Sequence, residues 1–225
     1  MIPLQLIDTA DLPDGGTLRL MHRGADHFIL FGRNELMSSR LKGSEEALAT
    51  LTCTPLRDRA EARVLIGGLG MGFTLRAAQK LLNGKAQIIV AELVPKIVEW
   101  AQGPLAHLFG DSLSDPRLSI RQEDVRASLL KAGSGAGYHA ILLDVDNGPD
   151  GLIHMENDWL YSMAGLRAAR AALAPGGVLA IWSAYDDPAF TDRLRKTGFA
   201  VDPVRTRATG GRKGAHHMIW LAAKR

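Results

Sequence analysis

The segment from Arg63 to Leu82, RVLIGGLGMGFTLRAAQKLL, carries the first residues whose types and spacing suggest chemistry. It begins as an apolar strand, breaks at Gly68, Gly70 and Gly72, and continues as an amphipathic helix. Glycines at the end of a strand let the backbone turn tightly and come close to a ligand. In an open α/β sheet, ligands bind beyond the carboxyl ends of the strands, so this loop is the first candidate binding site.

The spacing of these glycines does not suit a phosphate group. A dinucleotide fingerprint needs G-x-G-x-x-G, and Phe73 stands where its third glycine would be. A P-loop needs a lysine after its last glycine to neutralise the phosphates, and none follows here. Taken alone, the loop is also consistent with a plain strand-to-helix turn.

Two acids at the ends of the next two predicted strands favour a nucleoside ligand. Glu92 ends an apolar strand, where a carboxylate can accept both hydroxyls of a ribose. Asp124 ends the following strand, in LSIRQEDV, where it can accept from the exocyclic amine of a purine. Either acid alone is commonly a helix cap or a solvated strand end, but together beside a glycine loop they indicate a nucleoside.

Strands and helices alternate from Arg63 onward. Strands are predicted at 63–68, 87–92, 118–122, 139–144 and 177–183, with helices between them. This alternation predicts an α/β fold with right-handed crossovers and a mostly parallel sheet covered on both faces. The tail predicts two further strands that pair as an antiparallel hairpin around a basic loop.

Residues 1–43 read differently, so we expect an N-terminal β-hairpin extension before a Rossmann-like nucleoside-binding catalytic domain at 44–225. TLRLMH and HFILFG bracket RGAD as a hairpin, and NELMSS can add a third strand. A helix follows, for which Ser44 is the predicted N-cap. Near the end of the chain, Asp187 is predicted to cap a helix whose first residue is Pro188.

Composition bounds the classes of function. A chain of 225 residues with 46% hydrophobic residues is typical of one globular unit. Cys53 is the single cysteine, which leaves no internal disulfide and suits a reducing compartment. No acidic or histidine cluster has metal-ligand spacing, so no metal is expected. The net charge of +3 does not indicate nucleic acid, and no apolar run is long enough for a membrane span, so we expect a cytoplasmic protein.

Five segments carry a resemblance to a known family: VLIGGLGMGFTLRAA, IIVAELVPKIVEWA, RQEDVRASL, YHAILLDVD and LAPGGVLAIWS. In order and spacing they resemble the spermidine synthase-like branch of the AdoMet-dependent methyltransferase fold. The resemblance extends from about Leu18 to Ser183 and implies a Rossmann-like class I methyltransferase sheet. It also implies a transferase that uses AdoMet or decarboxylated AdoMet as co-substrate, a small-molecule acceptor such as an amine, and a possible homodimer.

The resemblance assigns the nucleoside-binding residues. The glycines of the loop would pass under the ribose and the sulfonium arm, Glu92 would hold the ribose diol, and Asp124 would hold the adenine amine. The full set implied for the co-substrate is Gly68, Gly70, Gly72, Glu92, Leu93, Asp124, Val125 and Asp144.

The resemblance also implies a catalytic residue and an acceptor site. Asp144 matches the family's catalytic aspartate, which takes a proton from the attacking amine, because an ammonium has no lone pair. Glu46 matches the last residue of a Tyr-His-Glu run that contacts the donor and the polyamine. The family's second loop acid falls on Asn147, with Asp146 near enough to replace it. Tyr185, after the fifth strand, is a further candidate for the acceptor site.

Three departures from the family weaken the expected diamine site. Met71 stands where aminopropyltransferases carry an aspartate, which would repel the carboxylate of ordinary AdoMet. Ser44 and Glu45 replace the tyrosine and histidine of the run, and Asn147 replaces an acid. We therefore expect methyl transfer from AdoMet slightly ahead of aminopropyl transfer from decarboxylated AdoMet to a polyamine.

Two further hypotheses stay open. The weakened acceptor motifs are also consistent with a non-catalytic protein that binds a nucleoside. The second hypothesis is a nicotinamide-dependent oxidoreductase on a similar sheet. The position of the third glycine in the loop disfavours it.

Overall fold

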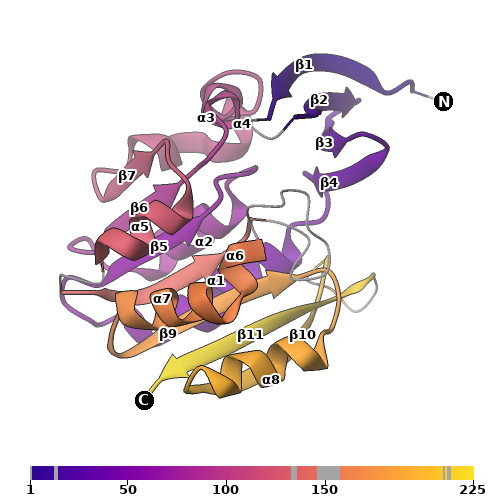
Figure 1. Ribbon diagram of the computed structural model, residues 1–225. Coiled ribbons are helices and arrows are strands. Elements are labelled where there is room, and N and C mark those ends of the chain that lie inside the picture. The colour runs from indigo at the N-terminus through magenta and orange to yellow at the C-terminus, as the bar shows by residue number, and fades with distance from the viewer. Residues whose placement is uncertain (1, 13–14, 133–135, 146–157, 210, 212–213) are drawn as a thin grey trace.

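A computed structural model describes residues 2–12, 15–132, 136–145, 158–209, 211 and 214–225. It contains a small antiparallel sheet and a larger, mainly parallel one (Figure 1). The small sheet has the order β1 (Gln5–Asp11), β2 (Thr17–Arg23), β3 (Asp26–Phe31) and β4 (Asn34–Ser38). The larger sheet has the order β10 (Phe199–Arg207), β11 (His216–Lys224), β9 (Leu173–Ser183), β8 (Tyr138–Leu143), β5 (Arg63–Gly67), β6 (Gln87–Ala91) and β7 (Leu118–Arg121).

Helices connect the strands of the larger sheet. They are α1 (Gly43–Cys53), α2 (Phe73–Leu81), α3 (Pro95–Gln102), α4 (Ala106–Phe109), α5 (Val125–Ala132), α6 (Asp158–Tyr161), α7 (Met163–Ala172) and α8 (Pro188–Lys196). Two short 3-10 turns, Thr54–Leu56 and Gly110–Ser114, complete the connections. No helix of the described residues is long and apolar enough to cross a membrane.

The central strands are buried on both faces, as parallel strands between two layers of helices must be. Along β5, Val64 and Ile66 belong to one hydrophobic cluster, and Leu65 belongs to the other. Side chains of α1, α2 and α3 complete the first cluster, and those of α5, α7 and α8 complete the second. In Figure 1, α7 and α8 lie in front of the sheet.

The strand order reverses at β5. The chain runs outward from β5 to β6 and β7, and it then returns to place β8 on the other side of β5. The carboxyl ends of β5 and β8 therefore flank the crevice where open α/β sheets bind their ligands. The larger sheet confirms the predicted fold class, including its antiparallel C-terminal hairpin of β10 and β11.

The N-terminal extension is a four-stranded sheet rather than a single hairpin. The predicted pair corresponds to β2 and β3, and NELMS forms β4. β1 was not predicted, because its side chains are mostly exposed, with Leu6 at 56%, and give no amphipathic pattern. Leu18, Leu20 and Ile29 join the first hydrophobic cluster, so the extension shares a core with the larger sheet.

A polar contact fastens the extension to α3. The indole Nε1 of Trp100 donates to Asp8 Oδ2 at 2.9 Å, and Lys96 Nζ lies 3.3 Å from the same oxygen. These bonds lower the pKa of Asp8, with the bond from Trp100 as the main cause. The small sheet is therefore held over the carboxyl ends of the strands.

Two predicted element boundaries differ from the structure by more than one residue. β9 begins at Leu173 rather than at residue 177, because Leu173 pairs with Tyr138 before the register shifts. The predicted N-cap Ser44 is the second residue of α1, since the N-cap is Lys42, which makes no side-chain cap bond. At α8 the prediction is confirmed, because Asp187 accepts from the amide of Phe190 at 2.9 Å.

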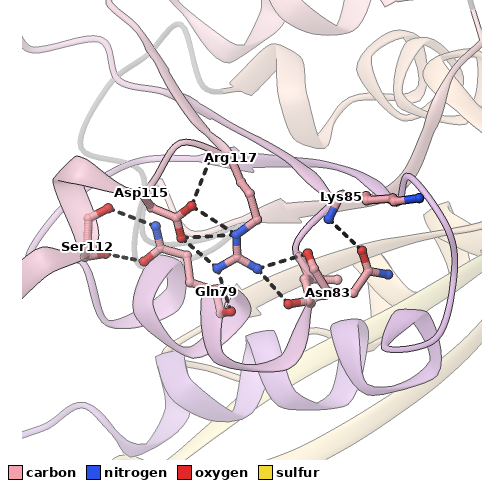
Figure 2. A network of polar contacts seen from close by, with 7 residues as sticks. Gln79, Asn83, Lys85, Ser112, Asp115 and Arg117 are labelled. Atoms are coloured by element: carbon pink, nitrogen blue, oxygen red, sulfur yellow. Dashed lines mark hydrogen bonds and ion pairs between the residues drawn. The ribbon is translucent and has the colours of Figure 1, made fainter.

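Arg117 joins β7 to the end of α2 at the edge of the larger sheet (Figure 2). Its guanidinium donates to the backbone carbonyls of Gln79, Leu82 and Asn83, and it pairs with Asp115 at 2.6 Å. The side chains of Arg117 and Asp115 are only 16% and 14% exposed. This network holds β7 against the rest of the sheet.

We predict that Arg117→Ala lowers the free energy of unfolding by about 2 kcal/mol, because three carbonyls and a partly buried carboxylate lose their donor. Urea unfolding monitored by circular dichroism measures this change. Arg195→Ala is the matched control, since its pair with Asp192 is exposed and is expected to contribute less than about 0.5 kcal/mol. Equal losses in the two variants would contradict the assigned role of Arg117.

Candidate functional site

A cavity lies at the carboxyl ends of β5, β6 and β8, beneath the small sheet. Its polar lining is acidic and consists of Glu45, Glu92, Asp124 and Asp144. Among the described residues that line it, there is no lysine, arginine or histidine. The other lining residues are Leu18, Ile29, Leu36, Met37, Gly68, Gly70, Ala91, Leu93, Val94, Ile97, Val125, Val145 and Trp182.

Glu92 ties together the two loops at the rim of the cavity. Its Oε2 accepts from the amide of Leu69 at 2.8 Å, and its Oε1 accepts from the amide of Val94 at 2.9 Å. Burial raises the pKa of Glu92, and these amide bonds act in the opposite direction. Each carboxylate oxygen has a further lone pair, so the clamped side chain can still accept from a diol.

Gly68 lets the ends of β5 and β8 approach each other. Its φ is +88°, and a Cβ there would strike the backbone carbonyl oxygen of Asp144. Gly70 also lines the cavity, beneath the thioether of Met37 from β4. Gly72 is instead the N-cap of α2 and faces the ring of Phe109, away from the cavity lining. Only two of the three glycines of the loop therefore face the candidate site.

The remaining residues expected at the nucleoside lie along the same rim. Leu93 follows Glu92, and Val125 opens α5 next to Asp124. Asp124 is half-buried, and its Oδ1 accepts from the amide of Arg126 at 2.8 Å, which fixes the carboxylate at the start of α5.

Asp144 follows β8 and is held by a residue that the sequence analysis did not single out. Thr74, in the first turn of α2, donates from Oγ1 to Asp144 Oδ2 at 2.8 Å. Thr74 is buried, so this bond is shielded from water. The sequence signal for this role of Thr74 was its position directly after the glycine loop, at the start of a helix that lies next to the end of the neighbouring strand.

Glu45 is the second carboxylate beside Asp144, and two further polar residues support it. The hydroxyl of Ser44 donates to Glu45 Oε2 at 3.1 Å, and His217 Nδ1 lies 2.9 Å from the same hydroxyl oxygen. Ser44 therefore links the carboxylate of Glu45 to the imidazole of His217 through one hydroxyl group. The imidazole also meets the indole of Trp182 edge-on, with ring centroids 4.8 Å apart.

These two carboxylates share one region of low dielectric. Burial raises the pKa of Glu45, and the neighbouring charge of Asp144 raises it further. Burial also raises the pKa of Asp144, while the bond from Thr74 acts in the opposite direction. Since the hydrogen bond favours the ionised form of Asp144, the empty pair holds a proton on Glu45 near neutral pH.

Glu46, the predicted acceptor residue, lies outside the cavity. Its side chain is 44% exposed and pairs with Lys42 at 3.7 Å. Glu45, the preceding residue of α1, lines the cavity and lies about 100° from Glu46 around the helix. A contact between Glu46 and the acceptor stays a prediction, and Glu45 is the residue of this pair that the structure places at the cavity.

Two other residues singled out from the sequence, Tyr185 and Met71, do not line the cavity. Tyr185 is 65% exposed and does not line the cavity. Met71 is 1% exposed and packs in the first hydrophobic cluster, not against the cavity. Asp146 and Asn147 lie outside the described residues. Among the described residues, no group of three or more histidine, cysteine or acidic side chains is arranged to hold a metal ion.

We predict that Glu45→Gln stabilises the protein above neutral pH. The pKa of Glu45 is raised on folding, so its contribution to stability is lost as pH rises from the ordinary glutamate range through the raised pKa. Glutamine carries no charge, so the variant should be more stable than the wild type by about 1 kcal/mol or more at pH 8 and by little at pH 5.

Thermal unfolding at the two pH values measures this difference. Glu46→Gln, the exposed neighbour, is the matched control and should leave the difference between pH values unchanged. A Glu45→Gln variant that is destabilised equally at both pH values would contradict the raised pKa.

Comparisons with known proteins identify relatives of this chain in sequence and in fold. No protein-family model matches the chain. A polyamine aminopropyltransferase of Mycobacterium tuberculosis is 31% identical over 163 residues, which is 68% of this chain and 30% of that protein. A polyamine aminopropyltransferase of Corynebacterium efficiens is 28% identical over 179 residues, or 78% of this chain and 33% of its own length. The chain thus spans about a third of the relatives it matches.

Solved structures show the same fold. The spermidine synthase of Thermotoga maritima superposes with a TM-score of 0.76 at 18% identity, over 98% of this chain and 73% of that one. A spermidine synthase in complex with the transition-state analogue AdoDATO gives a TM-score of 0.75, also at 18% identity and with the same coverage. In sequence and in fold, the chain is therefore spermidine synthase-like.

Proposed function

We propose that this protein is a transferase that moves the aminopropyl group of decarboxylated AdoMet to an amine. The observation that carries the proposal is the all-acidic polar lining of one cavity, in which two carboxylates adjoin a rim suited to a nucleoside. Such a cavity favours reactants that are both cationic: a sulfonium donor with an ammonium arm, and an amine acceptor. The similarity to polyamine aminopropyltransferases supports the same reaction.

The nucleoside half of the donor would lie along the glycine loop. Glu92 would accept the ribose hydroxyls, and Asp124 would accept the adenine amine, with Leu93 and Val125 against the ring. A purine base suits apolar walls with a single polar group at its edge.

The lining of the cavity favours the donor that carries no carboxylate. Ordinary AdoMet carries a carboxylate, which would need a cation, and the described lining offers only acids. Like charges about 4 Å apart repel by about 4 kcal/mol at an effective dielectric near 20. Met71 plays no part in this choice of donor, because its side chain is buried in the core. The named relatives are polyamine aminopropyltransferases, which supports aminopropyl transfer ahead of methyl transfer.

The reaction needs one base and no covalent intermediate. Asp144 accepts a proton from the ammonium of the acceptor, which frees the nitrogen lone pair. The lone pair attacks the methylene carbon bonded to the sulfonium, a carbon–nitrogen bond forms, and the carbon–sulfur bond breaks. The electrons of that bond pass to sulfur, which leaves as the neutral thioether methylthioadenosine. Thr74 keeps the Asp144 carboxylate fixed throughout.

The other hypotheses fit the site less well. A dinucleotide would bring phosphates into an acidic cavity, which disfavours a nicotinamide oxidoreductase. A non-catalytic nucleoside-binding protein is separated from the transferase by turnover and by the effect of Asp144→Asn on it. A homodimer and a cytoplasmic location stay predictions.

We predict that decarboxylated AdoMet binds the purified protein at least tenfold more tightly than AdoMet. Isothermal titration calorimetry with each nucleoside, with methylthioadenosine and with NAD measures the order of affinities. Tighter binding of AdoMet would overturn the proposed donor. Binding of none of them would favour a protein without this activity.

We predict that Asp144→Asn lowers kcat with decarboxylated AdoMet and a diamine by about 10³-fold or more, because the amide cannot take the proton. Methylthioadenosine should still bind within a few-fold of the wild type, since the variant keeps the shape of the side chain. Asp192→Asn, an exposed residue of α8, is the control and should leave turnover unchanged. Wild-type turnover in Asp144→Asn would remove Asp144 as the base.

A further inference from the structure

We propose that Glu45 binds the cationic group of the acceptor amine, with Ser44 and His217 holding its carboxylate in position. This inference deepens the proposed function and rests on it for the identity of the acceptor. The resemblance matched only Glu46 to the Tyr-His-Glu run that contacts the donor and the polyamine, whereas Glu45 replaces the histidine of that run and brings a carboxylate to its position.

Glu45 has the placement that such a role needs. It is 8% exposed, lines the cavity together with Asp144, and belongs to α1 rather than to the loop after β8. The two carboxylates thus reach the cavity from two separate elements. The backbone carbonyl of Glu45 also lies 3.4 Å from the hydroxyl of Thr74, the residue that fixes Asp144. One helix turn of α2 therefore contacts both carboxylate-bearing residues.

The support behind Glu45 continues outward to β11. Ser44 bonds to the carboxylate, and His217 bonds to Ser44 from the strand that borders β9. Trp182, a wall of the cavity, packs edge-on against the same imidazole. Burial lowers the pKa of His217, which favours the neutral imidazole behind Ser44.

The charges around Glu45 leave an unmet need for a cation. The ionisable groups that shift its pKa are Asp144 and Glu46, and both are acids. Lys42 pairs with Glu46 on the exposed face of α1, not with Glu45. Two neighbouring acids at low exposure raise the free energy of the protein when no cation lies beside them. An ammonium group bound between them would lower it.

This arrangement couples amine binding to a proton. In the empty cavity the pair holds a proton on Glu45, whereas a bound ammonium favours the ionised form of both carboxylates. Binding of the amine therefore releases a proton to the buffer. A glutamate that only supported the fold would not produce this release.

The test is calorimetric titration of the full-length protein with 1,4-diaminobutane, alone and with methylthioadenosine, in two buffers of different ionisation enthalpy. In the wild type, the apparent binding enthalpy should depend on the buffer and show proton release near pH 7. Glu45→Gln should weaken amine binding at least tenfold and abolish the release, while methylthioadenosine binds as before. Glu46→Gln should match the wild type in every titration.

Two outcomes would overturn the inference: wild-type amine affinity in Glu45→Gln, or no amine binding by the wild type. They are distinguishable from failure of the proposed function. If Asp144→Asn abolishes turnover while Glu45→Gln leaves amine affinity unchanged, only the role of Glu45 fails. If the amine binds through Glu45 but decarboxylated AdoMet gives no product, the transfer reaction fails instead.

His217 is tested as a positioning residue by a pair of variants. Asparagine can donate from nearly the same place as Nδ1, and leucine cannot. His217→Leu should raise the KM for the amine about threefold to tenfold with a smaller change in kcat, and His217→Asn should restore the KM. Equal effects of the two variants on KM would show that the imidazole contributes only packing against Trp182.

Discussion

The burial of acidic side chains without buried partners of opposite charge is the constraint on which this structure depends. Glu45 and Glu92 are buried and Asp144 is partly buried at one end of the sheet, and each needs a hydrogen-bond donor to remain there. Glu92 takes its donors from two backbone amides, Asp144 from Thr74, and Glu45 from Ser44. The loops and helix starts that supply these donors are the parts of the fold that surround the cavity.

The small sheet completes the site without contributing charge. Leu18, Ile29, Leu36 and Met37 line the cavity from above, so the acids face a low-dielectric wall. That wall strengthens every electrostatic interaction inside the cavity and keeps water from the carboxylates. The contact between Trp100 and Asp8 fixes the wall to α3, so the extension acts as part of the site.

Much of the site could be predicted from sequence because its residues follow strands. The carboxyl ends of parallel strands meet at one edge, so a glycine loop and acids at successive strand ends had to come together. Helix α1 offers no such guide. Both Glu45 and Glu46 belong to the first turn of α1, and only the packing of the helix against the rest of the fold turns Glu45 toward the cavity and Glu46 toward solvent. The direction of Met71 was equally hidden, since a side chain between two glycines can point to either the core or the ligand.

The contact between Gly68 and Asp144 has a consequence for how this protein can change over evolutionary time. Any side chain at position 68 would push the backbone of β8 outward and carry the carboxylate of Asp144 away from Thr74. Position 68 is thus closed to substitution as long as the acid after β8 is in use. A descendant that no longer used the acid after β8 could accept a side chain at position 68. The residue at position 68 therefore indicates whether the role of that acid was retained.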